Sequence, residues 1–349
     1  MAYFHLPVCI SPQNSFPEVD LSQIRESKNN LLEAIEPAYP GIPAGAMRRM
    51  GKSVRMAVGA ALPILDKFPQ PDGIVIATAN GGMEDCIKFL NQIVEYNEGL
   101  LTPANFVQST SNAGAAQIAL VTKNHNYNIT HVHRGLAFEN ALMDTMMLLK
   151  ENKFARYLMG STDVISAYNY NIDRNAGCFR DEPILNTQLF QSKAKGTIPG
   201  EGAFMVLMNN QQMDASAELN SVKTIHSSDP LTVLKTLQRF LSENFMQGEW
   251  PDLLLTGEDG DERLSPFYDI VESFMSESVR VARFKHFCGD YCTASSFASW
   301  LAIQIFDSGE VPVLLVKKAA TNKPIKRILI YNNYRGGQHS FILISAVDG

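Results

Sequence analysis

The sequence has no apolar run of about eighteen residues or more, the length a membrane-spanning helix needs. Its opening, MAYFHLPVCISPQNSF, also lacks the basic start and apolar core of a secretory signal. These absences exclude a membrane protein and argue against export. We therefore expect a cytoplasmic protein that makes no contact with a membrane.

Cysteine is sparse. The five thiols are odd in number and spread over 349 residues, which excludes a disulfide framework and favours reduced side chains. Cys288 and Cys292 lie four residues apart, which is not the CxxC spacing of redox and zinc sites. We expect both to be buried structural thiols.

Excess positive charge is missing as well. The formal net charge of −6 argues against broad nucleic-acid binding. No GxGxxG or other phosphate-binding loop occurs, and the pair His131 and His133 has no identifiable third ligand. We therefore expect neither a cofactor nor a metal ion.

The sequence is rich in short apolar runs that alternate with stretches of helical periodicity. The runs at 73–82, 155–165, 202–210, 250–257, 278–284, 311–318 and 327–333 predict buried strands. Apolar residues three and four apart predict helices at 53–68, 139–152 and 293–306. This alternation predicts an α/β protein with parallel or mixed sheets.

The weakest joint in this pattern is the polar run at 209–221, NNQQMDASAELNS, which has no apolar periodicity. We therefore expect two halves, residues 1–212 and 213–349.

Several segments, taken in order, resemble the landmarks of the β-ketoacyl-acyl-carrier-protein synthases. These enzymes belong to the thiolase superfamily. The segments are AMRRMGKSVRMAVGAALPILD (46–66), GIVIATANGGMED (73–85), LTPANFVQSTSNAGAAQIAL (101–120), KGTIPGEGAFMVLM (195–208), FKHFCGDYCTASSF (284–297) and NNYRGGQHSFILI (332–344). The resemblance implies a thiolase-like fold of five αβαβα layers, built from two related halves.

The residues that carry the family's chemistry are replaced. In the family, a cysteine on a strand-to-helix turn attacks the acyl thioester, and two histidines assist decarboxylation and stabilise the enolate. The cysteine position falls on His133, with Arg134 or Gly135 as the alternatives if the alignment slides. The histidine positions fall on Asp259 and Asp290, the second fixed by the family lysine at Lys285.

These replacements imply a chain that does not catalyse condensation alone, because an aspartate has the wrong charge to stabilise an enolate. Relatives without the cysteine are chain-length factors: each pairs with an active ketosynthase and shapes the tunnel that the growing acyl chain enters. The resemblance implies this role in fatty acid or polyketide (polyene) biosynthesis. Among such subunits, the chain most resembles those of aryl polyene and flexirubin-type pathways.

The implied partners are the active ketosynthase, in a heterodimer, and the acyl carrier protein. Ser109 to Leu120 and the helix with Met143, Met146 and Met147 are the candidates for interface and tunnel; the methionines are equally expected as ordinary core residues. The gating loop falls on Tyr334, Arg335, Gly336 and Gly337. The basic group Arg48, Arg49, Lys52 and Arg55 is a candidate carrier-protein site or simply a solvated helix face.

Two alternatives stay open. The first is an enzyme with altered chemistry, in which His133, Asp290 and Lys285 cluster and act on acyl thioesters by hydrolysis or decarboxylation. In this reading Cys178, in the loop leading to GEGA, is expected to be structural. The second is a homodimeric module that binds an acyl chain or carrier protein without chemistry.

Overall fold

The computed structural model describes residues 1–39, 41–191, 193–320 and 323–347, in which strands and helices alternate. The strands are β1 (Ala2–Ile10), β2 (Gly73–Ala77), β3 (Tyr127–His131), β4 (Tyr157–Asp163), β5 (Gly202–Asn209), β6 (Ala217–His226), β7 (Leu253–Thr256), β8 (Arg280–Arg283), β9 (Val316–Lys318), β10 (Arg327–Tyr334) and β11 (Gln338–Ser345). The helices are α1 (Ala44–Met47), α2 (Lys52–Leu65), α3 (Met83–Glu95), α4 (Pro103–Val107), α5 (Ala113–Thr122), α6 (Ala137–Glu151), α7 (Ala167–Asn175), α8 (Pro230–Asn244), α9 (Ser265–Phe274), α10 (Lys285–Cys288) and α11 (Ala294–Ser308). Short 3₁₀ turns cover Arg134–Leu136, Asn186–Gln188 and Val313–Leu315.

The strand order repeats between the two halves of the chain. It runs β3-β2-β4-β5-β1 and continues as β6-β11-β10-β7-β8-β9. In each half two parallel pairs are followed, towards the middle of the sheet, by two antiparallel pairs, with β1 corresponding to β6 and β5 to β11. The C-terminal half has β9 in addition, paired antiparallel with β8. β1 and β6 join the halves by an antiparallel pairing. This repeat supports our proposed division at residues 212–213, between β5 and β6.

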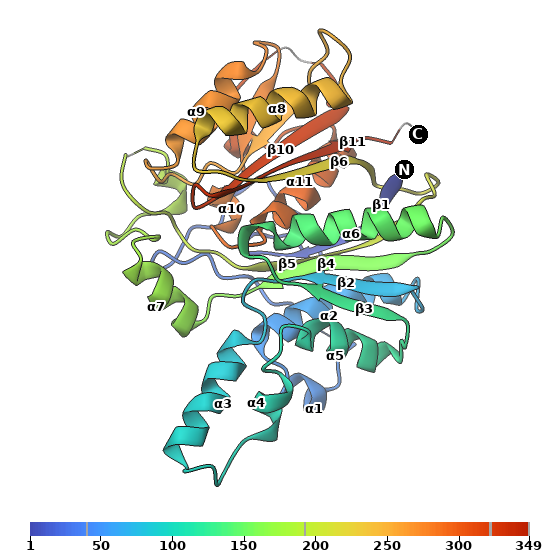
Figure 1. Ribbon diagram of the computed structural model, residues 1–349, viewed down its shortest axis with the longest axis vertical. Helices are drawn as coiled ribbons and strands as arrows, with labels where there is room; N and C mark the ends of the chain where they lie inside the picture. Colours follow the sequence, from blue (N-terminus) through green and yellow to red (C-terminus); the bar gives the residue numbers. More distant parts are fainter. Residues whose placement is uncertain (40, 192, 321–322, 348–349) are drawn as a thin grey trace.

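Five layers follow from this arrangement (Figure 1). Helices α8 and α9 cover the outer face of the C-terminal strands, and α2 and α5 cover the outer face of the N-terminal strands. Helices α6 and α11 lie between the two sets of strands and contact both. The expected αβαβα architecture of two related halves is therefore confirmed.

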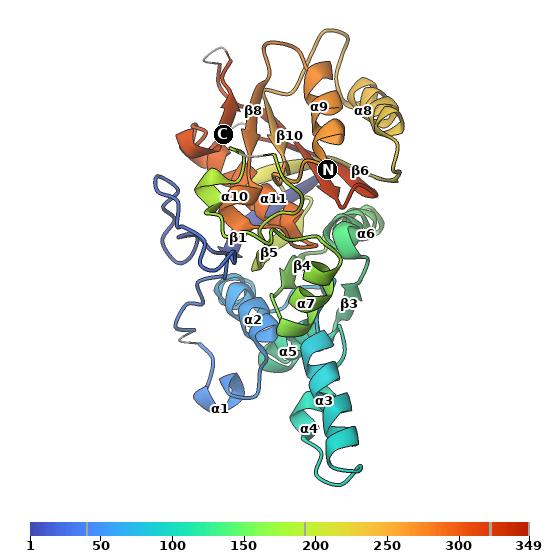
Figure 2. The same ribbon diagram turned by 90° about the vertical axis from the view of Figure 1, so that its left-hand side faces the viewer.

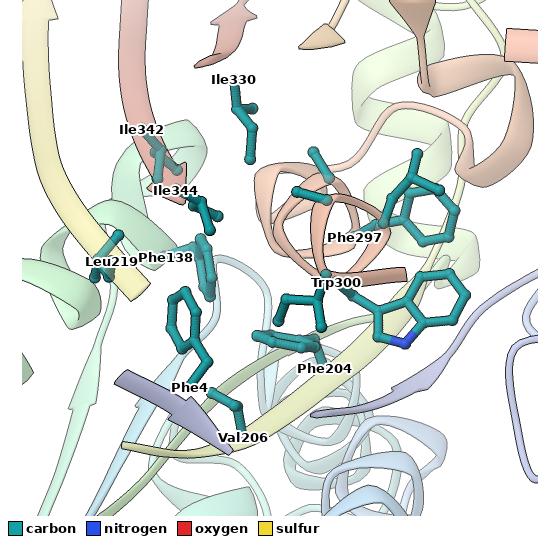
Figure 3. Packing of buried hydrophobic residues seen from close by; sticks show 14 of the residues in the cluster. Phe4, Phe138, Phe204, Val206, Leu219, Phe297, Trp300, Ile330, Ile342 and Ile344 are labelled. Carbon is teal, nitrogen blue, oxygen red and sulfur yellow. The ribbon is translucent and has the colours of Figure 1, made fainter. Parts of the chain in front are cut away.

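The central layer holds the largest apolar core (Figure 3). Phe4, Phe138 and Phe204 come from the N-terminal half, and they meet Leu219 and Ile344 from the C-terminal half. Helix α11 is buried on nearly every side, because its sequence ASSFASWLAIQIF gives small residues where neighbouring strands approach. The two halves therefore share one core.

Two segments differ from expectation. The apolar run at 311–318 forms a 3₁₀ turn and only the short strand β9, and Val313, Leu314 and Val316 within it are exposed. The polar run at 209–221 contains the start of β6, which alternates between buried and half-buried residues.

Helices α3 and α4 extend away from the layered body (Figure 2). Within the described residues no helix has the length and apolar character needed to cross a membrane.

Candidate functional site

The first element of the candidate site is the sharp turn between β3 and α6. The strand ends at His131, and Arg134 takes a left-handed backbone conformation with φ 48°. A side chain on such a strand-to-helix turn is exposed at the top of the sheet, the position that a nucleophile elbow uses. Val132, His133, Arg134 and Gly135 form the turn, so it carries no thiol or hydroxyl group.

The turn is closed from above by Tyr334, the last residue of β10. A Cβ atom on Gly135 would lie 2.2 Å from the Cβ of Tyr334, so only glycine fits there. The Tyr334 hydroxyl accepts a hydrogen bond from the Cys292 thiol (3.2 Å). Tyr334, predicted to be a gating residue, is thus a buried side chain wedged between the turn and α11.

The two histidines near the turn are engaged elsewhere. His131 contacts Asp144 of α6 through its Nε2 atom (3.0 Å). His133 contacts the Asn140 side chain (2.7 Å), and its exposed ring lies 5.3 Å from the ring of His226. The structure therefore does not bring His133 to Asp290 and Lys285, so the three-residue cluster of the altered-chemistry alternative does not form.

Asp259 and Asp290 do meet, in a cavity of about 330 Å³ between the two halves of the chain. Asp290 is held by backbone pairing with the PGEGA segment: its amide donates to the Ile198 carbonyl and its carbonyl accepts from the Gly200 amide. Gly200 permits this approach, since a Cβ there would lie 1.8 Å from the Cys288 carbonyl oxygen. The motif therefore fixes the wall of the cavity.

Lys285 lies beneath the cavity, 1% exposed, with its ammonium 2.6 Å from the Asp290 carboxylate and 3.3 Å from the Asn333 carbonyl. Burial would lower the pKa of Lys285, but the charges of Asp290 and Asp259 outweigh it and raise that pKa. Lys285 thus stays a cation and holds Asp290 in place.

Asp259 is the carboxyl group of the cavity that enters no ion pair with the described residues. Its Oδ1 accepts a hydrogen bond from the Asp261 amide (3.1 Å). Burial raises the pKa of Asp259 to about 7, and the nearby Lys285 charge offsets only part of this effect. A carboxyl group with such a pKa can donate or accept a proton near neutral pH.

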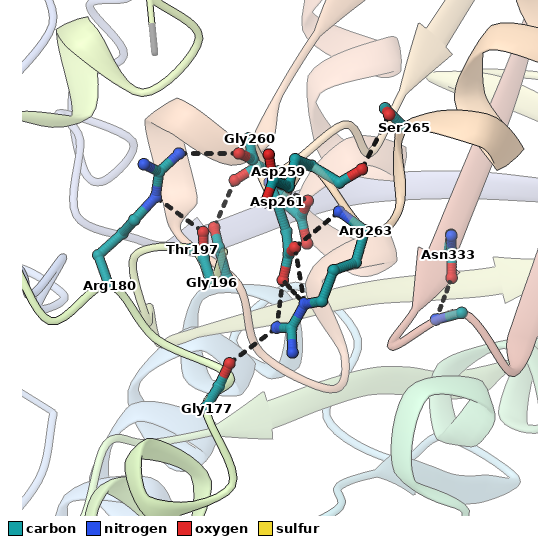
Figure 4. Close-up of polar contacts among 12 residues, drawn as sticks. Gly177, Arg180, Gly196, Thr197, Asp259, Gly260, Asp261, Arg263, Ser265 and Asn333 are labelled. Carbon is teal, nitrogen blue, oxygen red and sulfur yellow. Dashed lines mark hydrogen bonds and ion pairs between the residues drawn. The ribbon is translucent and has the colours of Figure 1, made fainter. Parts of the chain in front are cut away.

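Charged neighbours line the rest of the cavity (Figure 4). Arg263 binds the Asp261 carboxylate with Nε and Nη2 and donates to the Gly177 carbonyl (2.7 Å). Burial would raise the pKa of Asp261, but the Arg263 hydrogen bonds hold it below its usual value. The neighbouring carboxyl groups Asp259 and Asp261 thus have pKa values shifted in opposite directions.

The predicted gating residues divide around this cavity. Arg335 (φ 54°) and Gly336 line it, and the Arg335 guanidinium pairs with Asp173 of α7 (2.6 Å). Gly337 completes the turn into β11, with its amide donating to the Tyr334 carbonyl. Met143 is half-buried on α6 and lies outside the cavity lining.

Cys178 also lines the cavity, although the sequence places it in a loop far from the turn. Burial raises the pKa of its thiol, so it lacks the thiolate character of a nucleophile. Cys288 and Cys292 are buried, as expected.

Asp163 is a residue that sequence reasoning missed. Its buried carboxylate accepts hydrogen bonds from the amides of Ala79 and Asn80 and from the hydroxyls of Thr78 and Thr293. It therefore ties the turn after β2 to the start of α11. The only sequence signal is a lone acidic residue at the end of an apolar run.

The structure also bears on the predicted basic group and on metal binding. Of the basic group, Lys52 pairs with buried Glu201 and Arg55 pairs with Glu36 (2.8 Å). Only Arg48 and Arg49 of that group have no ion pair among the described residues. Within the same residues, no three His, Cys, Asp or Glu side chains gather as a metal site.

A model of the N-terminal domain of β-ketoacyl synthases matches residues 22–247. A search of curated proteins finds no significant match. Among solved structures, a β-ketoacyl synthase from Burkholderia phymatum STM815 superimposes with a TM-score of 0.81 at 13% identity, covering 99% of both chains.

Two further structures have the same fold at the same identity of 13%. The ishigamide ketosynthase/chain length factor has a TM-score of 0.80 and covers 100% of this chain and 99% of its own. The AntDE:AntF complex, described as a type II PKS acyl-carrier protein with its ketosynthase bound to the hexaketide, has a TM-score of 0.77 and covers 99% of both chains.

Proposed function

This chain belongs to the β-ketoacyl synthase family, and we propose that it is a non-catalytic subunit of the chain-length-factor kind, which pairs with an active ketosynthase. The observation that carries the proposal is the turn between β3 and α6. It spans His133, Arg134 and Gly135, the residues that the family resemblance assigns to the nucleophile position, and Tyr334 packs directly on Gly135. A turn without a thiol or hydroxyl, covered by a tyrosine, lacks the cysteine with which a ketosynthase forms its acyl-enzyme.

The proposed partner surface surrounds strand β3. This strand is the last in the sheet order, so one of its edges is unpaired. Apolar side chains are exposed beside it: Val132 (51% exposed) follows the strand, and Leu120 (72%) ends α5. Met147 on α6 is exposed as well. An apolar surface of this kind next to a free edge supports pairing with another protein.

The test is co-purification with the ketosynthase encoded nearest to this chain, followed by condensation with acyl- and malonyl-carrier protein. We expect the pair to elongate acyl chains and this chain alone to be inactive. Val132→Asp combined with Leu120→Asp should abolish co-purification. Met213→Asp, which changes an exposed methionine in the loop between β5 and β6, is the matched control and should leave it intact. A stable homodimer that ignores the ketosynthase would contradict the proposal.

A second candidate function rests on the cavity. Asp259, with its pKa near 7, and the Asp290–Lys285 pair are suited to general acid–base chemistry on an acyl thioester, by hydrolysis or decarboxylation. Hydrolysis by the isolated chain would release thiol from acyl-N-acetylcysteamine, and decarboxylation would release carbon dioxide from malonyl-N-acetylcysteamine. Asp259→Asn should abolish formation of either product and His133→Ala should leave it unchanged, because His133 lies outside the cavity. Absence of both products would exclude this candidate.

A further inference from the structure

A second hollow lies near strand β9, which is the last strand at the end of the sheet opposite β3. Its volume is about 680 Å³, twice that of the cavity with Asp259. Three chain segments form it: residues 19–22 of the N-terminal loop, the last turn of α11, and residues 310–314. Figure 2 shows the blue N-terminal loops on the same side of the molecule as the orange-red segment after α11. We call this hollow the β9 groove.

The walls of the β9 groove are apolar and accessible. Val313 is 86% exposed, and Val19 and Leu314 are each about half exposed. The floor is formed by Ile305 of α11, which belongs to the central core. Large apolar side chains that are gathered and exposed mark an interaction surface more often than scattered ones do.

The rim of the groove is negative. Asp307 and Glu310 are the ionisable residues of the lining, and both are exposed, without an ion pair among the described residues. Glu18 and Asp20 flank the opposite wall. Neither wall carries a lysine or arginine: the sequence has none at 17–24 or at 294–316. The carboxylates on the two sides therefore have no internal cation to neutralise them.

We infer that the β9 groove binds a basic, amphipathic segment of a partner protein. Apolar side chains of that segment would pack on Val19, Val313 and Leu314, and its lysine or arginine side chains would meet the carboxylates of the rim. The same rim repels a fatty acid and an acidic carrier protein. The groove is separate from the β3 surface, so both can be occupied in one molecule.

The test uses a fluorescein-labelled peptide KLLKLLKLLK and its charge-reversed counterpart ELLELLELLE, with fluorescence anisotropy as the readout. We expect the lysine peptide to bind and the glutamate peptide to bind at least about tenfold more weakly. Asp307→Lys with Glu310→Lys should weaken binding of the lysine peptide at least about fivefold. Val313→Asp, at an exposed position, should weaken it about tenfold.

The matched control is Glu151→Lys with Asp269→Lys, which changes the net charge equally at exposed sites outside the groove. It should alter the affinity by less than about twofold. Equal weakening by the two charge reversals would overturn the inference, because attraction would then be general. Equal binding of both peptides, or dimerisation of the chain that Val313→Asp abolishes, would also overturn it, in favour of an apolar ligand or a second copy.

Discussion

Gly135 and Tyr334 touch at the turn between β3 and α6, so Gly135 has no room for a side chain. Gly135→Ala should lower the free energy of unfolding by about 2 kcal/mol or more, because its Cβ collides with Tyr334. In a Tyr334→Gly background the same change should cost less than about 1 kcal/mol. Urea unfolding of the four proteins measures this coupling, and an equal cost in both backgrounds would contradict the contact.

Asp259 makes the protein sensitive to pH. Its folded pKa, about 7, lies above the ordinary value of 3.8, so the folded state binds the proton more tightly than the unfolded state. Its contribution to stability is therefore greatest below about pH 4 and is lost as pH rises towards 7. Asp259→Asn has no carboxyl group to ionise, so its free energy of unfolding should not fall in this way. Between pH 5 and 7.5 that free energy should rise by about 1 kcal/mol or more relative to the wild type.

The neighbouring Asp261 is the control for that experiment. Its folded pKa is held below the ordinary value, so it stabilises the protein above its unfolded pKa and loses this contribution as pH falls. Relative to the wild type, Asp261→Asn should therefore have a lower free energy of unfolding at neutral pH, and this deficit should shrink at acid pH. The pH dependence is the opposite of that expected for Asp259→Asn. Parallel pH profiles for the two variants, measured by urea unfolding, would contradict the assigned directions.

Individual site residues were predictable where a motif fixes the register. Lys285 and Gly289 place Asp290, and the structure puts Asp290 and Asp259 in one cavity. The turn was not resolved from sequence, because a shift of one residue among His133, Arg134 and Gly135 leaves the pattern unchanged. The structure adds the left-handed backbone angle at Arg134 and the contact of Gly135 with Tyr334, and which residue takes the cysteine position stays a prediction.

At the scale of elements, Asp163 links the end of β4 to the turn after β2 and to α11. Asp163→Ala would leave the half-buried amides of Ala79 and Asn80 without the carboxylate and should lower the free energy of unfolding by about 3 kcal/mol or more. Thr293→Val removes a single hydrogen bond to the same carboxylate and should cost only about 1 kcal/mol. Chemical unfolding measures the free energy of unfolding of both variants. Similar losses in the two variants would show that the amides of Ala79 and Asn80 find other hydrogen-bond partners.

Periodicity predicted many of the long or buried elements well, but it assigned no strand to β1, β3, β6 or β11. Helices α2, α6 and α11 and strands β2, β4 and β5 lie within a few residues of their predicted ranges. They are long or wholly buried, so their apolar spacing is distinct. Strand β9 is short because the run before it forms a 3₁₀ turn after Pro312, in which Val313 and Leu314 are exposed and Leu315 is buried. No pattern of apolar residues alone distinguishes that outcome.

At the scale of the whole molecule, the shared central core makes the two halves depend on each other. Fragments 1–212 and 213–349 should each aggregate when produced alone, because α6 and α11 would lose contacts with the opposite strands. Produced together, they should elute as one complex of the full-length size. A fragment 1–212 that unfolds cooperatively on its own would contradict this dependence.

The contact between Gly135 and Tyr334 also bears on evolution. Tyr334 bonds to Cys292, and its neighbour Arg335 bonds to Asp173, so the closed turn is held by several mutually supporting residues. On the proposed function, a change of Arg134 to cysteine would place a thiol at a turn that Tyr334 covers, and Asp259 and Asp290 would still stand where the family resemblance assigns the two histidines. On that function no one substitution restores turnover, so selection for activity has no first step to favour. Further change would then be expected to favour pairing with an enzyme over catalysis.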